Sequence, residues 1–184
     1  MEQSGEIRIA ASRAEVWSAL NDPDVLGECI KGAQNVNKID DEHFDVTVKA
    51  KIGPISATFQ ASLELKDLDP PSSYVIEGNA KGGAAGFARG SASVTLIEEG
   101  DETVLRYAVK ANVGGKLAQI GSRLVDGVAR KMADDFFAQF CQRLDPGAAA
   151  VAATDKDEVE SGTGQLKIWL IAFGVLVLAL LLTL

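Results

Sequence analysis

The chain has 184 residues, of which 47% are hydrophobic, and 26 acidic against 18 basic side chains give it a net charge of -8. This length suits one ordinary domain with a sizeable core plus a tail. The acidic balance, with no basic stripe between aromatic residues, argues against a nucleic-acid partner. Two widely separated cysteines exclude a disulfide framework and suit a reducing cytoplasm.

The first elements are a strand and two short helices. Residues 6–9 alternate polar and apolar side chains as a half-buried strand does. Ser12 and Glu15 have the spacing of a capping box, which predicts a helix over residues 13–20. Pro23 then restarts the chain as a second helix that runs to Ile30, and Gly32 marks its exit. The N-terminus is acidic and lacks the apolar run of a signal peptide, so we expect a cytoplasmic domain.

Residues 35–113 form a series of alternating runs separated by turn signals. In residues 44–51 and 55–65, apolar and polar side chains alternate, which places the apolar ones on one face of each strand. Six strands fit this region, and the short turns between them predict an antiparallel meander.

Residues 117–144 read as one long helix that covers the sheet. Apolar side chains recur there at steps of three and four residues. They are Leu117, Leu124, Val128, Met132, Phe136 and Phe140. A strand, two helices, six strands and a long helix is the order of an α+β helix-grip fold, in which a curved antiparallel sheet wraps the last helix. We therefore expect one domain over residues 1–144.

A helix grip often encloses a cavity, and aromatic residues with a flexible Met at inward positions are candidates to line it. The same residues would serve equally well as ordinary core. The candidates are Trp17, Leu20, Leu26, Phe44, Phe59, Phe87, Tyr107, Leu124, Val128 and Met132.

The C-terminal region predicts a linker and a membrane anchor. Residues 145–164 are rich in Ala, Gly and acids and lack a sustained period, as expected of a flexible linker. Residues 165–184 include an uncharged run, 168–184, that is apolar on all sides and long enough for one transmembrane helix. This predicts a single-pass anchor in the cytoplasmic membrane. Its residues include Lys167 and Trp169 at the interface, then Leu170, Phe173, Leu176 and Leu180.

Catalytic and metal-binding signals are weak. His43 is the chain's one histidine and has no second histidine with which to share a metal. Cys29 and Cys141 lie beside apolar helix faces, which favours core packing. The glycine run at residues 82–90 continues into a strand instead of opening a helix, unlike a phosphate-binding loop. The inward positions hold no His, Asp or Glu, so we expect no catalytic residues, no metal and no enzyme activity.

Five segments occur together in a fixed order and carry a family resemblance. They are VWSALNDPDVLGECI, KIGPISATF, DPPSSYVIEG, KGGAAGFARGSA and VGGKLAQIGSRLV. With these segments, residues 1–144 resemble the G-subunit proteins of carbon monoxide dehydrogenase (CoxG), which belong to the START-like SRPBCC superfamily. One departure is Lys31, which stands where members commonly carry a Pro.

The resemblance implies an accessory role beside a molybdenum-containing oxidoreductase of the carbon monoxide dehydrogenase type. The protein would recruit that enzyme to the lipid bilayer and bind or carry a lipophilic small molecule such as a quinone, either menaquinone or ubiquinone. Tyr107 and backbone N–H groups near Gly86 are candidate polar contacts for the quinone headgroup. Two alternatives stay open: a cavity-containing enzyme of the cyclase or hydrolase type, and a pure docking module without a ligand.

Overall fold

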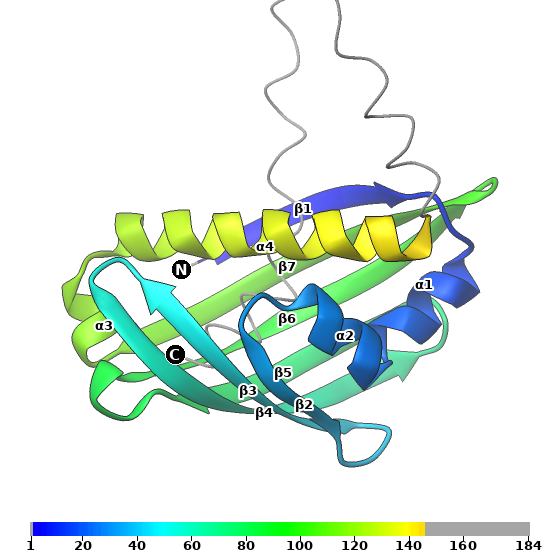
Figure 1. The fold of residues 1–184 in the computed structure, drawn as a ribbon. Helices are drawn as coiled ribbons and strands as arrows, with labels where there is room; N and C mark the ends of the chain where they lie inside the picture. Colours follow the sequence, from blue (N-terminus) through cyan, green and yellow to red (C-terminus); the bar gives the residue numbers. More distant parts are fainter. Residues whose placement is uncertain (1, 146–184) are drawn as a thin grey trace, which may run out of the picture.

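The computed structural model describes residues 2–145, which form one antiparallel sheet with helices at its ends and along its concave side (Figure 1). The elements in chain order are β1 (Glu2–Ile9), α1 (Arg13–Leu20), α2 (Pro23–Cys29), β2 (Ala33–Lys38), β3 (His43–Ile52), β4 (Ile55–Asp69), β5 (Ser73–Lys81), a 3-10 turn (Gly83–Ala85), β6 (Phe87–Glu99), β7 (Glu102–Gly114), α3 (Lys116–Gln119) and α4 (Ser122–Leu144).

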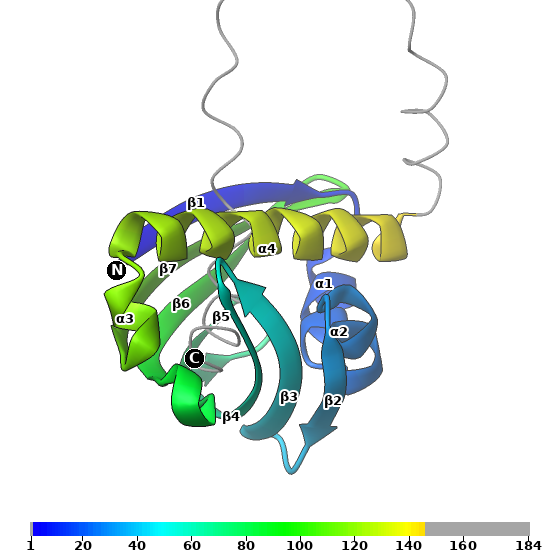
Figure 2. The ribbon, with the colours of Figure 1, turned by 60° about the vertical axis from the view of Figure 1, so that its left-hand side comes forward.

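The seven strands follow the order β1-β7-β6-β5-β4-β3-β2, with every neighbouring pair antiparallel. Strands β2 to β7 are consecutive neighbours, so the predicted six-strand meander is confirmed. The two short helices carry the chain from β1 at one edge of the sheet to β2 at the other. Figure 2 shows how strongly the sheet curves between these edges, so that its concave side encloses the core.

Both short helices begin as their sequences predict. The backbone N–H of Ser12 donates to Glu15 Oε2 at 3.0 Å, and the N–H of Glu15 donates to Ser12 Oγ at 3.4 Å, which completes the capping box. At α2, Asp22 Oδ1 accepts from the N–H groups of Asp24 and Val25, and Pro23 occupies the first turn. These caps satisfy N–H groups that the first helical turn leaves without partners.

The long helix begins later than predicted. A separate short helix, α3, ends at Gln119, and Gly121 then adopts a φ of +93° before α4 begins at Ser122. The prediction of one continuous helix from Leu117 was therefore wrong, because a residue with positive φ interrupts a right-handed helix.

The buried face of α4 is also rotated from the predicted one. Phe136 and Phe140 are buried as expected, but Leu124 is 42% exposed and both Val128 and Met132 are only half-buried. Ala129 and Ala133 are buried in their place. The buried residues of α4 are Val125, Ala129, Ala133, Phe136, Phe137 and Phe140.

Within residues 2–145, no helix has the length and hydropathy needed to cross a membrane. The predicted anchor at residues 165–184 and all of the predicted linker beyond Asp145 lie outside the described residues.

Candidate functional site

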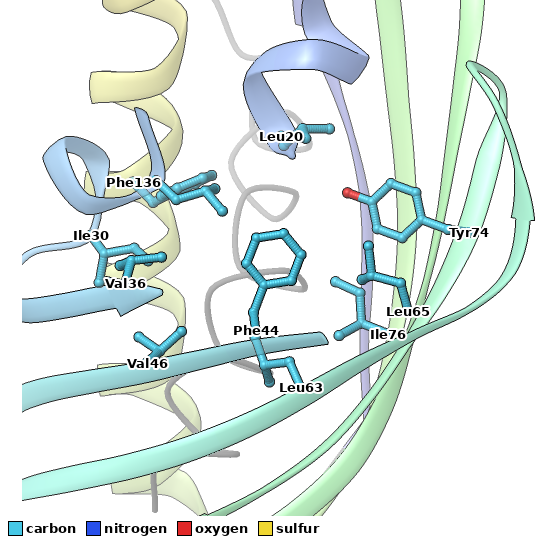
Figure 3. A pocket seen from close by; sticks show the side chains of 11 residues that line it. Leu20, Ile30, Val36, Phe44, Val46, Leu63, Leu65, Tyr74, Ile76 and Phe136 are labelled. Atoms are coloured by element: carbon cyan, nitrogen blue, oxygen red, sulfur yellow. The ribbon is translucent and has the colours of Figure 1, made fainter. Parts of the chain in front are cut away.

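An apolar cavity of about 40 Å³ lies between the short helices, the strands β2 to β5 and α4 (Figure 3). It exceeds the roughly 10–15 Å³ that one water molecule needs. The side chains come from elements far apart in the sequence, so the cavity exists only in the completed fold. They are Leu20, Leu26, Ile30, Val36, Phe44, Val46, Leu63, Leu65, Tyr74, Ile76 and Phe136.

The strand register explains why these side chains meet. Phe44 on β3 pairs with Leu63 on β4, and Leu65 pairs with Ile76 on β5. Directly opposite Leu63 stands Gly78, which has no side chain to fill the space beside it. Since alternate residues of a strand share a face, this register gathers the large apolar residues into one patch on the concave side.

Tyr74 is the one cavity-lining residue with a polar side chain. Its side chain is 3% exposed, and its hydroxyl points into the cavity (Figure 3). Trp17 holds the ring by an edge-on contact with 5.2 Å between ring centroids. Among the described residues the hydroxyl has no hydrogen-bond partner, and burial raises its pKa far above the ordinary value, so it stays a neutral donor.

Three of the ten residues that the sequence nominates line this cavity: Leu20, Leu26 and Phe44. Trp17 contributes indirectly through its contact with Tyr74. Phe59 and Tyr107 are buried in the core without lining the cavity.

The other four nominated residues lie away from the cavity. Phe87 is 48% exposed, and its ring covers Gly114 on the neighbouring strand. Leu124, Val128 and Met132 line a separate groove between β3 and α4. The rotation of α4 described above is the reason, because it turns this row of side chains away from the concave side.

Eight of the eleven cavity-lining residues were not nominated from the sequence, and Tyr74 is the polar one among them. It belongs to the segment SYVIEG, whose alternation places Tyr74 and Ile76 on the same apolar face. That pattern was available, but Tyr107 shows the same alternation on β7. The position of β5 next to β4 and the contact of Tyr74 with Trp17 of α1 distinguish the two tyrosines.

The described side chains that line the cavity include no His, Cys, Asp or Glu. Within the part of the chain that the structure describes, no three His, Cys, Asp or Glu side chains group to hold a metal ion. His43 lies on the exposed side of β3, where its Nδ1 is 2.8 Å from Asp40 Oδ1. Burial raises the pKa of the Cys29 thiol to about 11 and also raises the pKa of the Cys141 thiol. Both thiols are therefore protonated and unreactive near neutral pH.

The arrangement of the curved seven-stranded sheet and the long final helix is shared with known proteins. Residues 5–145 match the family model of the carbon monoxide dehydrogenase G-subunit (CoxG). The chain belongs to the CoxG family. This confirms the resemblance that the five sequence segments carry. No curated protein matches the sequence.

Solved structures share this fold. A conserved protein from Geobacillus kaustophilus is 31% identical, with a TM-score of 0.74 over 79% of this chain and 96% of its own. A START superfamily protein from Mycobacterium smegmatis is 14% identical, with a TM-score of 0.59 over 79% and 97%. A Thermus thermophilus protein is also 14% identical, with a TM-score of 0.60 over 84% and 100%. The last two show the START-like fold alone.

Proposed function

We propose that this protein is a membrane-anchored accessory protein that binds a lipophilic ligand and recruits a molybdenum-containing oxidoreductase of the carbon monoxide dehydrogenase type. Family membership supports the accessory role. The observation that carries the ligand-binding part is the apolar cavity with a single inward-pointing hydroxyl, that of Tyr74. An apolar site with few polar groups is typical of small-molecule binding sites.

A quinone, either menaquinone or ubiquinone, fits the chemistry of these walls. The rings of Phe44 and Phe136 offer flat apolar surfaces for an aromatic headgroup. The Tyr74 hydroxyl is a neutral donor without a partner among the described residues, and a quinone carbonyl is an acceptor. A bound quinone would supply the capacity to accept electrons, while the protein's own residues bind it and exclude water.

The volume of the cavity sets a condition on this proposal. About 40 Å³ is far less than the roughly 300–1,000 Å³ of typical small-molecule sites. Ligand binding therefore requires the walls to move apart. The wall formed by α2 and β2 is the candidate to move, because α2 has only seven residues and its Leu26, like Val36 on β2, is only half-buried.

The membrane part of the proposal rests on the C-terminal sequence. The uncharged run at residues 168–184 would hold the domain at the cytoplasmic membrane, with the domain in the cytoplasm. A linker of about 20 residues spans roughly 25 Å as a flexible chain. Tethering of this kind raises the local concentration of the domain near lipid-soluble ligands and near a docked enzyme.

One alternative has a specific observation in its favour. The small volume of the cavity also suits a docking module that binds no ligand. An enzyme of the cyclase or hydrolase type is less well supported, because the side chains that line the cavity include no carboxylate, imidazole or amine to move a proton at neutral pH.

Mass spectrometry of the full chain, purified in mild detergent from membranes that contain quinone, tests the ligand part. Co-purified quinone at a constant ratio to protein is expected. If the purified protein reproducibly contains no quinone and also binds neither added menaquinone nor added ubiquinone, the result would favour the docking module that binds no ligand.

Fractionation of cells tests the recruitment part. Cells that produce the protein without residues 165–184 are compared with cells that produce the full chain, and the amount of partner oxidoreductase in the membrane fraction is measured. An unchanged amount on the membrane after the deletion would contradict the adaptor role.

A further inference from the structure

A second concave surface, the groove between β3 and α4, has a volume of about 710 Å³ and lies outside the apolar cavity. We call it the β3–α4 groove. Five basic side chains line it against one acidic one, Asp135. The basic residues are Lys31, Lys49, Lys51, Arg123 and Lys131.

The charge of this groove opposes that of the whole chain, which is -8. Lys31 and Lys131 share the single carboxylate of Asp135, at 3.6 and 3.1 Å. Lys49, Lys51 and Arg123 have no ion-pair partner among the described residues. Clustered like charges repel one another and destabilise a fold slightly. A negatively charged partner that neutralises them would remove that cost.

The floor of the groove is apolar. Leu124, Val128 and Met132 follow one another at four-residue steps on α4, so they form a row along its exposed edge. Leu124 is 42% exposed, and its Cδ2 lies against the turn at Gly53 between β3 and β4. Val128 and Met132 are half-buried beside it. An apolar row that is partly exposed beside basic side chains is typical of surfaces that dock on a lipid interface.

We propose that the β3–α4 groove is the face that this domain places against a bilayer containing anionic phospholipids. The lysines and Arg123 would contact the phosphate groups, and the Leu124 row would contact the upper acyl chains. An acidic protein surface would match the charge, but the apolar floor favours an amphiphile over a purely polar partner. The inference deepens the proposed function and rests on its membrane location.

The β3–α4 groove and the apolar cavity share a wall. Lys31 and Asp135 line the groove, while their sequence neighbours Ile30 and Phe136 line the cavity. A domain docked through the groove would hold this wall against the lipid. A lipophilic ligand would then have the shortest path between bilayer and cavity.

The test uses residues 1–145, so that the predicted anchor contributes no binding. The Geobacillus kaustophilus protein is matched over 96% of its chain by 79% of this one, which supports the use of the domain without the predicted anchor. The domain is floated with phosphatidylcholine vesicles and with vesicles containing 30% phosphatidylglycerol, in low and high salt. We expect the domain to bind the vesicles that contain phosphatidylglycerol and not those of phosphatidylcholine only. This binding should be lost in high salt.

A double charge reversal locates the surface. Lys49→Glu with Lys51→Glu should weaken binding about 25-fold or more, since each basic residue at an anionic surface contributes about fivefold. The matched control is Arg89→Glu with Lys110→Glu, which changes the net charge by the same amount on another surface. This control should lose far less affinity for the phosphatidylglycerol vesicles.

Three outcomes would overturn the inference: equal binding to both vesicle types, equal losses in the two double variants, or no binding to either vesicle. A groove variant that keeps vesicle binding but no longer captures the oxidoreductase would assign the face to the enzyme instead. None of these results bears on whether the cavity holds a quinone, which the mass spectrometry measures separately.

Discussion

Lys31 Nζ lies 3.6 Å from Asp135 Oδ2, so an ion pair joins the turn after α2 to the middle of α4. Ile30 and Phe136, the neighbours of this pair in sequence, both line the apolar cavity. The pair therefore crosses the wall between the cavity and the β3–α4 groove. Lys31 is 73% exposed and Asp135 is 31% exposed, so the pair adds little to the free energy of unfolding.

Removing this pair should change ligand exchange more than stability. Asp135→Asn is expected to lower the free energy of unfolding by less than about 1 kcal/mol. Since the wall then loses a link to α4, quinone should dissociate several times faster, measured by transfer to acceptor vesicles. Asp134→Asn is the control, because Asp134 lines neither concave surface. Equal transfer rates for the two variants would show that the pair does not hold the wall.

Tyr74→Phe should weaken quinone binding without disturbing the fold. The substitution removes the one hydroxyl that points into the cavity and leaves the ring against Trp17. A lost hydrogen bond of about 1 kcal/mol corresponds to roughly fivefold weaker affinity, measured by titration with a short-chain quinone. Tyr107→Phe is the matched control, since Tyr107 is similarly buried but does not line the cavity. A larger effect at Tyr107 would place the headgroup elsewhere.

His43 should titrate above its ordinary pKa of 6.5. Its Nδ1 lies 2.8 Å from Asp40 Oδ1, and this hydrogen bond favours the protonated imidazole and so raises its pKa. The resulting stabilisation is complete below pH 6.5 and is lost as the pH rises through the higher pKa of the folded state. Because the chain has one histidine, proton NMR reads its titration directly. Asp40→Asn should return the pKa towards 6.5, and an unchanged pKa would contradict this assignment.

The sequence predicted the elements of this fold well because local chemistry determines them. Ser12 with Glu15, and Asp22 with Pro23, specify two helix starts within a few residues each. Alternation along β3 and β4 identifies the inward faces without any knowledge of the partner strands. The break before α4 was missed because Gly121 is tolerated inside a helix at modest cost, and only its φ of +93° reveals the interruption.

The cavity was harder to predict because it depends on register and helix rotation. Phe44 was found, but Leu63 and Ile76 line the cavity only because β3, β4 and β5 pair in one particular register. The apolar residues of α4 occupy more than one face, so periodicity alone did not decide between the Leu124 row and the alanine row. The completed fold decides it, because it buries Ala129 and Ala133 and leaves Leu124 42% exposed.

Gly32→Ala should be strongly destabilising. Gly32 has a φ of +87°, and a Cβ atom added there would collide with the carbonyl oxygen of Lys49. The N–H of Lys49 donates to the Gly32 carbonyl at 2.9 Å, so the chains cannot separate without losing this bond. We expect the free energy of unfolding, measured by urea denaturation, to fall by more than about 2 kcal/mol.

The control for this substitution is Gly127→Ala. Gly127 lies in α4 with nothing within 4 Å of an added Cβ, so alanine should stabilise the protein by about 0.5–1 kcal/mol through its helix propensity. Similar effects at the two positions would contradict the tight packing of Gly32 against β3.

Val46→Leu tests whether a bound quinone occupies this cavity. Val46 lines the cavity and is 3% exposed, so one added methylene group should fill part of the 40 Å³ and stabilise the free protein by up to about 1 kcal/mol. Val48→Leu, on the same strand and face but outside the cavity, should instead overpack the core and destabilise it by about 1–3 kcal/mol. If the protein carries a quinone, Val46→Leu must also weaken quinone binding, because methylene and headgroup compete for the same space. Stabilisation with unchanged binding and unchanged enzyme recruitment would instead place the ligand outside this cavity.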